Sequence, residues 1–274
     1  AANIGVQVAL PSNHETFSEV DPDPPVSMHA SCADCHEPHT MTRAETQAPL
    51  IPGNFGRIDG VSASGSPVMQ AETEYEVCFK CHADTNPVQP WVPRVAGQNN
   101  TRLEFDPSAV SFHPVEVPGR NPDVPSLKPG WTTQDLVRCS DCHAVNGSNP
   151  GDKEPGGVHG SAHGPLLAAN YSTLDYTSES PQAYALCYSC HDRNSILGNE
   201  SFPGHRRHVV EERASCAACH DAHGISSLQG SPMGNTHLMN FDASVVLPDP
   251  GTGRLEFRDT GVLSGACYLR CHGV

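Results

Sequence analysis

The chain has few charged residues and no long hydrophobic run. Charged residues make up 17% of its 274 residues, below the usual level of about 25%. No stretch approaches the roughly 18 apolar residues of a membrane helix, so the sequence predicts no membrane span. Basic residues number 16 against 31 acidic ones, which gives a formal net charge of −15. The sequence therefore predicts no nucleic-acid partner, because a basic face is needed to bind a phosphate backbone.

Apolar residues are also few, whereas glycine and proline are abundant. About 43% of the residues are apolar, counting glycine and leaving tyrosine out, against about 45–50% in ordinary globular domains. The 24 glycines and 25 prolines favour turns and extended connections. We therefore expect a mostly irregular, coil-rich chain with a few short helices, short β-hairpins and little conventional core.

Cysteine, in contrast, is plentiful and regularly arranged. Five times, two cysteines with two residues between them are followed at once by histidine. In a sixth case three residues lie between the cysteines. These six motifs, numbered 1 to 6 in chain order, use all 12 cysteines. They are Cys32/Cys35/His36, Cys78/Cys81/His82, Cys139/Cys142/His143, Cys187/Cys190/His191, Cys216/Cys219/His220 and Cys267/Cys271/His272.

C-x-x-C-H is the attachment signature of haem c, in which both thiols form thioethers to the porphyrin and the histidine binds the iron. On a short helix, residues i, i+3 and i+4 share one face, so two thiols and an imidazole can meet one macrocycle. Zinc sites and disulfides are the alternatives, but neither explains a histidine after every second cysteine. The sequence therefore predicts a haem-packed multihaem cytochrome c with six covalently attached haems.

The predicted domain organisation is simple. Residues 1–31 are polar and rich in proline, which favours an extended N-terminal arm. The motifs are spread evenly over residues 32–274, so we expect a single hexahaem domain there. The chain begins with Ala1 and Ala2, as a mature exported protein does, and attachment of haem c outside the cytoplasmic membrane also implies export.

Two local patterns predict secondary structure and packing. Arg-Leu-Glu-Phe occurs at residues 102–105 and 254–257, and its alternation of polar and apolar residues predicts short strands. The second copy follows a Pro-Asp-Pro-Gly turn signal, so residues 244–258 are expected to form a small hairpin. In motifs 2 and 4, aromatic residues flank the first cysteine, where they are expected to pack on the porphyrin edge. Both of these motifs are expected at the end of a short helix.

Sixteen histidines less the six proximal ones leave ten, enough for a second histidine on every iron. The preferred distal ligands are His39, His113, His159, His208, His223 and His237. His29 and His205 are held in reserve, and His14 and His163 are favoured least. Methionine could cap an iron instead, but histidine is in ample supply.

The resemblance to a known family lies in residues 111–115, 157–161, 187–197, 219–224 and 237–241. These segments resemble the multihaem c-type cytochromes of metal-reducing bacteria. Some members of that group polymerise outside the cell into filaments with a continuous haem chain, and in certain members a histidine just after the first haem motif ligates a haem of the adjoining subunit.

The resemblance implies that His39 bridges subunits in such a filament. The partners would then be other copies of the chain, a redox protein donor, and an extracellular acceptor such as a metal oxide or another cell. The expected function is electron transfer by a secreted protein. A soluble periplasmic shuttle and a multihaem reductase with one open haem remain alternatives, although the lysine-ending haem motif of many nitrite reductases is absent.

Overall fold

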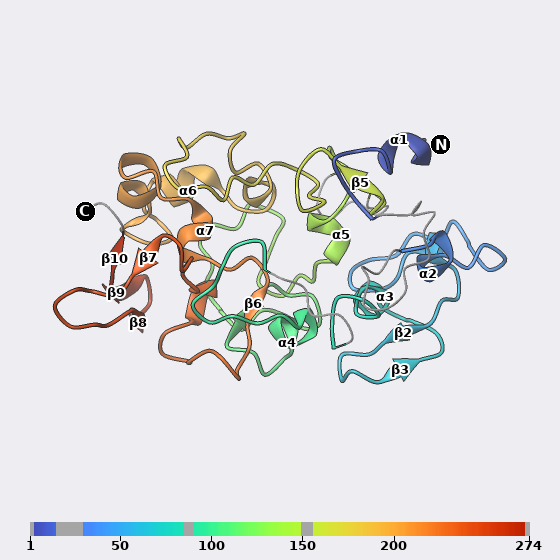
Figure 1. Ribbon diagram of the computed structural model, residues 1–274, viewed down its shortest axis with the longest axis horizontal. Coiled ribbons are helices and arrows are strands. Elements are labelled where there is room, and N and C mark those ends of the chain that lie inside the picture. The colour runs from blue at the N-terminus through green and yellow to red at the C-terminus, as the bar shows by residue number, and fades with distance from the viewer. Residues whose placement is uncertain (1–2, 15–29, 85–89, 149–155, 272–274) are drawn as a thin grey trace, which may run out of the picture. The chain divides into compact units, whose positions relative to one another are not determined.

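Very short helices and strands, joined by irregular segments, make up the described part of the chain. The computed structural model describes residues 3–14, 30–84, 90–148 and 156–271. Within these ranges no helix exceeds five residues, and only strands β8 and β9 have more than two (Figure 1). None of these helices has the length and apolar character needed to cross a membrane. The haem-packed core stays a prediction.

The chain divides into two compact units. Unit 1 comprises residues 1–80 and 137–170, and unit 2 comprises residues 81–136 and 171–274. The chain passes from unit 1 to unit 2 between Lys80 and Cys81, within motif 2. The single domain expected at residues 32–274 stays a prediction.

Unit 1 carries motifs 1 and 3 on single helical turns. Its helices are α1 (Ile4–Gln7), α2 (Cys32–Cys35), η1 (Gly53–Phe55), α3 (Glu74–Cys78) and α5 (Cys139–Cys142). Its strands form two antiparallel pairs, β1 (Ser12–Asn13) with β5 (Gly160–Ser161) and β2 (Gly60–Val61) with β3 (Pro67–Val68). A small cluster of Ile58, Ala71 and Val77 forms the apolar core of this unit.

The predicted arm lies partly in this unit. Residues 15–29 lie outside the described part of the chain. Residues 3–14 contain α1 and β1, and β1 pairs with β5, so this stretch packs on unit 1 over part of its length.

Unit 2 carries motifs 4, 5 and 6. Its helices are α4 (Thr101–Phe105), η2 (Cys187–Ser189), α6 (Arg193–Leu197), the π-helical turn η3 (Arg207–Glu211), α7 (Cys216–Cys219) and η4 (Thr236–Leu238). Its antiparallel strand pairs are β4 (Ser111–Phe112) with β6 (Gly224–Ile225), β7 (Val246–Leu247) with β10 (Arg270–Cys271), and β8 (Glu256–Gly261) with β9 (Ser264–Tyr268). Two small apolar clusters lie within it, one around Tyr184 and Tyr188 and one around Phe241 and Phe257.

The two copies of Arg-Leu-Glu-Phe adopt different structures. The predicted strand at residues 102–105 is wrong, because this copy lies in helix α4. The Asn100 side chain caps that helix by accepting a hydrogen bond from the Arg102 amide at 3.2 Å. In the other copy Glu256 and Phe257 begin strand β8. The alternation of polar and apolar residues in this tetrapeptide therefore does not determine its conformation, and the flanking residues do.

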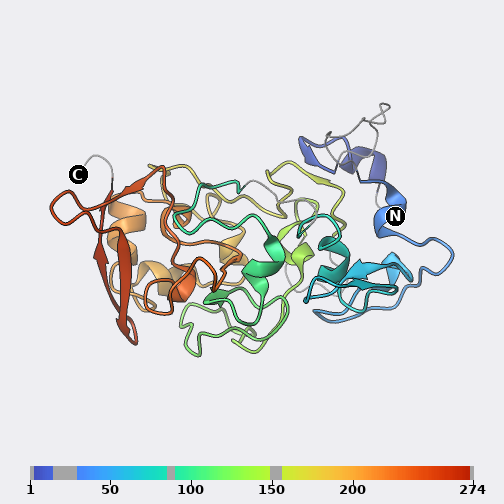
Figure 2. The same cartoon turned by 60° about the horizontal axis from the view of Figure 1, so that its bottom comes forward.

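The predicted hairpin at residues 244–258 is also wrong. The turn exists, since the Gly253 amide donates to the Asp249 carbonyl at 2.8 Å. However, the strands on either side of this turn pair elsewhere, β7 with β10 and β8 with β9. The hairpin is therefore formed by β8 and β9, drawn at the red end of the colour scale in Figure 2.

The helix of motif 4 does not extend through the second cysteine of that motif. Helix η2 is a 3-10 turn that ends at Ser189, so Cys190 lies one residue beyond it. The Cys190 amide donates to the Cys187 carbonyl at 3.3 Å, and the Cys190 carbonyl accepts a hydrogen bond from the Lys128 amide at 2.9 Å. Because that carbonyl is bonded to a distant segment, it is not used to continue the helix. A helix that holds both cysteines is therefore the wrong expectation for Cys190.

Candidate functional site

Motifs 1, 3, 4 and 5 are single helical turns closed by the same hydrogen bond. In each, the histidine amide donates to the carbonyl of the first cysteine, over 2.8–3.0 Å, and the pairs are His36 to Cys32, His143 to Cys139, His191 to Cys187 and His220 to Cys216. This i to i+4 bond places both thiols and the imidazole on one side of the turn. The local geometry therefore suits attachment of one macrocycle to each motif.

Motif 4 keeps this geometry although its helix is shorter. Cys190 follows η2 with φ −111° and ψ −24°, which is still in the right-handed helical region. Its side chain is half-buried, as is that of Cys187. Cys190 can therefore present its thiol beside Cys187, and its role in haem attachment stays a prediction.

The residues between the cysteines help to start these turns. In motif 1, Asp34 accepts a hydrogen bond from the Ser31 amide at 2.7 Å, and in motif 3, Asp141 accepts one from the Arg138 amide at 2.7 Å. Each aspartate thereby satisfies a backbone donor just before the first turn. In motif 5 the corresponding residues, Ala217 and Ala218, are buried and small instead.

Motifs 2 and 6 have different backbones. In motif 2, helix α3 ends at Cys78, and Cys81 and His82 follow in a turn. In motif 6, Cys267 lies on β9 and Cys271 lies on β10. His272 is outside the described residues, as is His29 among the distal candidates.

Charged side chains from elsewhere in the chain hold the motif backbones. In unit 1, buried Glu74 accepts hydrogen bonds from the Ser140 amide (2.9 Å) and hydroxyl (2.8 Å) in motif 3. The Lys80 ammonium donates to the Asp34 carbonyl in motif 1 at 3.0 Å. Both contacts satisfy backbone or side-chain polar groups that the haem turns would otherwise leave unpaired.

In unit 2, charged side chains also donate hydrogen bonds to the backbones of the motifs. The Arg94 guanidinium donates to the Ala217 carbonyl at 2.6 Å, to the His220 carbonyl at 2.8 Å and to the Asn240 carbonyl at 2.9 Å. In motif 4, the Lys128 ammonium donates to the Tyr188 carbonyl. Sequence reasoning missed these four residues, because only the folded chain brings them to the motifs.

Three predicted proximal histidines face a second histidine. Ring centroids lie 6.1 Å apart for His36 and His159 in unit 1, and in unit 2 they lie 6.4 Å apart for His191 and His113 and 6.2 Å apart for His220 and His205. A metal bonds an imidazole nitrogen at about 2 Å, so two rings on opposite sides of one metal have centroids about 6.3 Å apart. The spacing of all three pairs therefore fits an iron held between two imidazoles.

In the histidines of these pairs, and also in His143, the ring nitrogen Nδ1 takes part in a hydrogen bond. Among proximal histidines, Nδ1 lies near the carbonyl oxygen of Asn54 for His36 (2.8 Å), of Pro165 for His143 (3.0 Å) and of His237 for His220 (3.0 Å), and near Ser126 Oγ for His191 (3.1 Å). Distal candidates follow the same rule, with Nδ1 near the Ala222 carbonyl for His113 (2.6 Å), Gln7 Oε1 for His159 (3.0 Å) and Ser201 Oγ for His205 (3.1 Å). The carbonyl and amide oxygens only accept, so they fix the ring with the proton on Nδ1 and the lone pair on Nε2. The Ser126 and Ser201 hydroxyls hold the rings of His191 and His205 but do not fix their tautomers.

Burial keeps several of these rings neutral. It lowers the pKa of His191, His205 and His220 to about 4 in each case, with neighbouring histidines adding to the effect. Only a neutral imidazole offers a lone pair to a metal. These three side chains are therefore in the ligating form at neutral pH.

The remaining distal candidates have other surroundings. His39 and His208 are exposed. His223 Nδ1 lies 2.9 Å from Glu104 Oε2, and although burial lowers the pKa of His223, this carboxylate raises it overall. His237 differs from the paired rings, because its Nε2 lies 3.3 Å from an Asp259 oxygen. The assignment of these four as ligands stays a prediction.

Cysteines of different motifs lie next to one another. In unit 1 the thiols of Cys78 and Cys139 are hydrogen-bonded, and both sulfurs lie within 4.8 Å of a Glu74 oxygen. In unit 2 the thiols of Cys187 and Cys216 are hydrogen-bonded. No disulfide joins any of the 12 cysteines, all of which lie in the described part of the chain. Motifs 2 and 3, and likewise motifs 4 and 5, thus have adjoining attachment points.

Buried aromatic residues accompany motifs 2 and 4, and their expected packing on the porphyrin edge stays a prediction. Phe79 and Tyr184 are almost fully buried within the described chain. The Tyr184 hydroxyl is buried without a hydrogen-bond partner, and a buried hydroxyl normally has one. An orphaned donor three residues before Cys187 fits a bound group with acceptor oxygens, such as the propionates of a haem.

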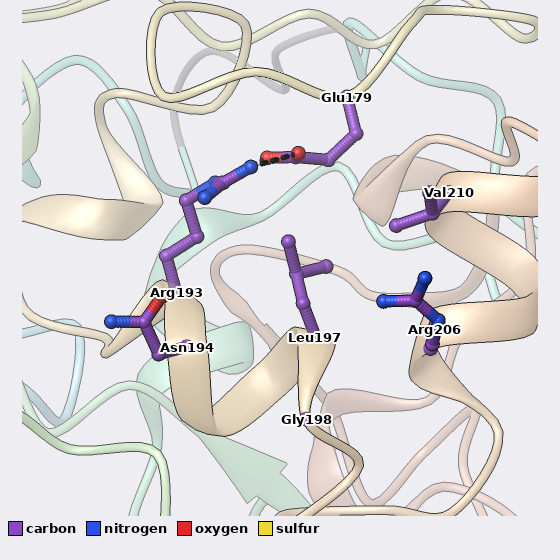
Figure 3. Close-up of a pocket in the computed structure, with 7 residues that line it drawn as sticks. All are labelled: Glu179, Arg193, Asn194, Leu197, Gly198, Arg206 and Val210. Atoms are coloured by element: carbon purple, nitrogen blue, oxygen red, sulfur yellow. Dashed lines mark hydrogen bonds and ion pairs between the residues drawn. The ribbon is translucent and has the colours of Figure 1, made fainter.

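A pocket of about 380 Å³ lies beside helix α6 (Figure 3). Its lining residues are Glu179, Arg193, Asn194, Leu197, Gly198, Arg206 and Val210. Figure 3 shows the Glu179 carboxylate and the Arg193 guanidinium pointing toward each other, with Arg193 Nε 2.8 Å from Glu179 Oε1. The lining contains neither cysteine nor histidine, so the predicted haem ligands do not come from it.

Comparison with known families identifies the middle of the chain. A family model described as outer membrane cytochrome MtrC/MtrF-like, domains II/IV, matches residues 62–230, which is more than half of the chain. The match contains motifs 2 to 5 and confirms the resemblance to multihaem c-type cytochromes of metal-reducing bacteria. No curated protein and no solved structure is significantly similar to the chain.

Proposed function

The chain belongs to the outer membrane cytochrome MtrC/MtrF-like family, and from this premise we propose that it conducts electrons through six covalently bound haems whose irons are each closed by two histidines. Membership of the family makes it an electron-transfer cytochrome with c-type haem. The haem number, the ligand pairs and the extracellular filament described below are our inferences.

The observation that carries the proposal is the set of facing histidine pairs. Their centroid separations of 6.1–6.4 Å match two imidazoles on one iron. An iron with two protein ligands has no coordination position for a substrate, and catalysis at haem requires an open or exchangeable one. The three pairs therefore leave no substrate position at the irons of motifs 1, 4 and 5, and we infer that the other three irons are closed in the same way, as electron transfer rather than a reductase requires.

The side chains of this protein supply the positions and the electrostatics. Bound haem c supplies one-electron chemistry, and two histidine ligands keep its potential lower than a histidine and a methionine do. The hydrogen bonds to Nδ1 hold the rings in place. Desolvation lowers the pKa of His191, His205 and His220 to about 4, so these rings are neutral and able to bind a metal at neutral pH.

The adjoining cysteines support short distances along the path. Cys78 and Cys139, and likewise Cys187 and Cys216, would hold haems whose attachment points adjoin. Electrons would then pass between motifs 2 and 3, and between motifs 4 and 5.

Electron paramagnetic resonance of the oxidised, haem-loaded protein tests this function. The expected spectrum contains low-spin ferric haem only, and the haem content by pyridine haemochromogen assay is expected to be six per chain. A substantial high-spin ferric signal would contradict closed irons and favour the reductase.

The second part of the proposal is assembly outside the cell into a filament, with His39 ligating a haem of the adjoining subunit. His39 is exposed and follows His36 by three residues. In certain filament-forming cytochromes that the chain resembles, a histidine just after the first haem motif ligates a haem of the adjoining subunit. A homopolymer of this kind would carry electrons from a redox protein donor to an extracellular acceptor such as a metal oxide or another cell. A periplasmic shuttle would need no such contact.

Negative-stain electron microscopy of the secreted protein tests the filament. The wild type is expected to form uniform filaments, and His39→Ala is expected to abolish them and leave one haem per subunit high-spin. His39→Met keeps an axial ligand and serves as the matched control, in which short filaments are expected to persist. Monodisperse wild-type particles across salt and pH would contradict the filament but leave electron transfer intact.

A further inference from the structure

The pocket beside helix α6 in unit 2 combines charged and apolar walls. In Figure 3 the Glu179–Arg193 ion pair lies on one side, Arg206 and Val210 lie on the other, and Leu197 lies between them. Its volume of about 380 Å³ falls within the range of about 300–1,000 Å³ that is usual for small-molecule sites. The pocket can therefore hold a small ligand or one edge of a larger one.

The carboxylate on one side of the pocket already has its partners. The Glu179 side chain is only 6% exposed, and it accepts hydrogen bonds from Arg193 Nε at 2.8 Å and from the Tyr188 hydroxyl at 3.0 Å. The hydrogen bond from Arg193 lowers the pKa of Glu179, although burial opposes the effect. The carboxylate is therefore charged and neutralises Arg193, so this side of the pocket carries no net charge.

Arg206, on the other side, has no comparable partner. Its Nε lies 3.7 Å from Glu211 Oε1, which is beyond hydrogen-bond distance, and its guanidinium makes no hydrogen bond within the described part of the chain. The backbone of this residue is fixed, because the Arg206 amide donates to Asn199 Oδ1 at 2.8 Å. A guanidinium carries five N–H donors, so Arg206 can donate to a ligand in the pocket that it lines.

The surroundings of Arg206 favour a carboxylate among the possible anions. A carboxylate matches the planar fork of a guanidinium with two parallel hydrogen bonds. Leu197 and Val210 line the same pocket and offer apolar contact to the body that carries the carboxylate. Because Glu211 lies near the guanidinium, a doubly charged phosphate would meet more repulsion than a singly charged carboxylate.

The pocket adjoins the surroundings of two haem motifs. Arg206 directly follows His205, whose ring lies 6.2 Å from that of His220 in motif 5. On the other side, Glu179 is bonded to Tyr188 of motif 4. A carboxylate can therefore come from either of two sources, a propionate of a bound haem or a small molecule from solution.

We propose that this pocket binds a carboxylate through the Arg206 guanidinium, with Leu197 and Val210 against the apolar body that carries it. The inference goes beyond the proposed function, because it requires neither irons closed by two histidines nor a filament. A carboxylate from solution needs only the pocket, and a propionate needs only bound haem c.

Calorimetric titration of the full, haem-loaded protein with 2-naphthoate tests a carboxylate from solution. One-to-one binding is expected, and Arg206→Gln is expected to weaken it about tenfold, because a charge-assisted hydrogen bond is lost. Arg207→Gln is the matched control and should keep the wild-type affinity. Arg207 is the next residue and has a similar ion pair, with Nε 3.8 Å from Glu212 Oε1, but it does not line the pocket. Binding that Arg206→Gln leaves unchanged, or that both variants weaken equally, overturns the inference.

A propionate in the pocket would exclude naphthoate, and the haem potentials then decide. Loss of a positive charge beside a propionate disfavours the reduced haem. Arg206→Gln is therefore expected to lower one midpoint potential in a spectroelectrochemical titration, whereas Arg207→Gln should keep the wild-type values. If naphthoate does not bind, potentials that are unchanged in Arg206→Gln, or shifted equally in both variants, overturn the inference for both sources.

Discussion

Motifs 5 and 6 present the same three residue types on different backbones within unit 2. In motif 5, Cys216–Cys219 form one helical turn, and the His220 amide closes it on the Cys216 carbonyl at 2.9 Å. In motif 6, Cys267 and Cys271 lie on strands β9 and β10. The two motifs differ in spacing, since motif 6 has one more residue between its cysteines than motif 5.

The two motifs are also stabilised in different ways. Motif 5 is held by hydrogen bonds from the buried guanidinium of Arg94. Motif 6 is held by strand pairing, with Cys267 opposite Phe257 on β8 and Cys271 opposite Val246 on β7. Three-residue spacing breaks the i, i+3, i+4 geometry, so cross-strand contacts replace the helical turn in holding the thiols.

One apolar cluster connects both motifs. Phe257, Ala218 and Val246 are among its buried members, and Cys219 and Leu269 pack against it. Burial raises the pKa of the Cys219 thiol to about 12, with Cys267 and Cys271 adding to the effect. The attachment points of motifs 5 and 6 are therefore neighbours despite their different backbones.

Replacing Arg94 should produce the largest effect and should act on motif 5. Arg94→Met leaves the half-buried Asp221 carboxylate without its cation and three carbonyls without a donor. We expect the free energy of unfolding to fall by about 3–5 kcal/mol, measured by guanidinium titration followed by circular dichroism. Arg258→Met is the control, because this exposed arginine should contribute less than about 1 kcal/mol.

A loss no greater for Arg94→Met than for the Arg258 control would show that Arg94 does not anchor motif 5. Arg94→Lys adds a finer comparison. It keeps the charge but loses the planar fork that reaches several carbonyls at once, so an intermediate loss is expected.

Reducing the ring of Phe257 should have a smaller effect that reaches both motifs. Phe257→Leu removes part of a buried ring that lies opposite Cys267 and packs in the cluster with Ala218. We expect a loss of about 1–2 kcal/mol in the same titration. The exposed Val262 in the β8–β9 turn offers the control Val262→Ala, which should be neutral. Equal stability of the two variants would mean that the cluster does not connect the motifs.

The smallest expected effect concerns motif 6 alone. The Arg254 guanidinium lies 3.5 Å from the centre of the Tyr268 ring and pairs with Glu256. Because these groups are solvent-accessible, Arg254→Gln should lower the melting temperature by less than Phe257→Leu does. Arg254→Lys retains a cation over the ring and should lower it less still. A fall in melting temperature larger than that of Phe257→Leu would indicate that motif 6 depends on this contact rather than on its strands.

Local sequence predicted the haem motifs well and their surroundings poorly. The cysteine spacing predicted helical turns, and motifs 1, 3 and 5 have them from one cysteine to the other, whereas the turn of motif 4 ends just before Cys190. His113 and His159 were preferred as distal ligands and each faces a proximal histidine, although their role as ligands stays a prediction. The helical turns were predictable because they depend only on residues close in sequence.

Contacts between distant residues account for what was missed. His205 was only a reserve, yet its ring lies 6.2 Å from that of His220. Arg94 reaches motif 5 across more than 120 positions, and no local pattern marks it. The Lys128 amide likewise binds the Cys190 carbonyl from a distant segment. The tetrapeptide Arg-Leu-Glu-Phe forms a helix after Asn100 but begins a strand opposite β9, so its conformation is decided by capping and pairing rather than by alternation.

The central claim is that the irons are closed by the facing histidine pairs. A density map of the haem-loaded protein from electron cryomicroscopy or crystallography tests it most directly. The account predicts one iron between His36 and His159, one between His113 and His191, and one between His205 and His220. Water, an open position or a different side chain on any of these three irons would contradict it.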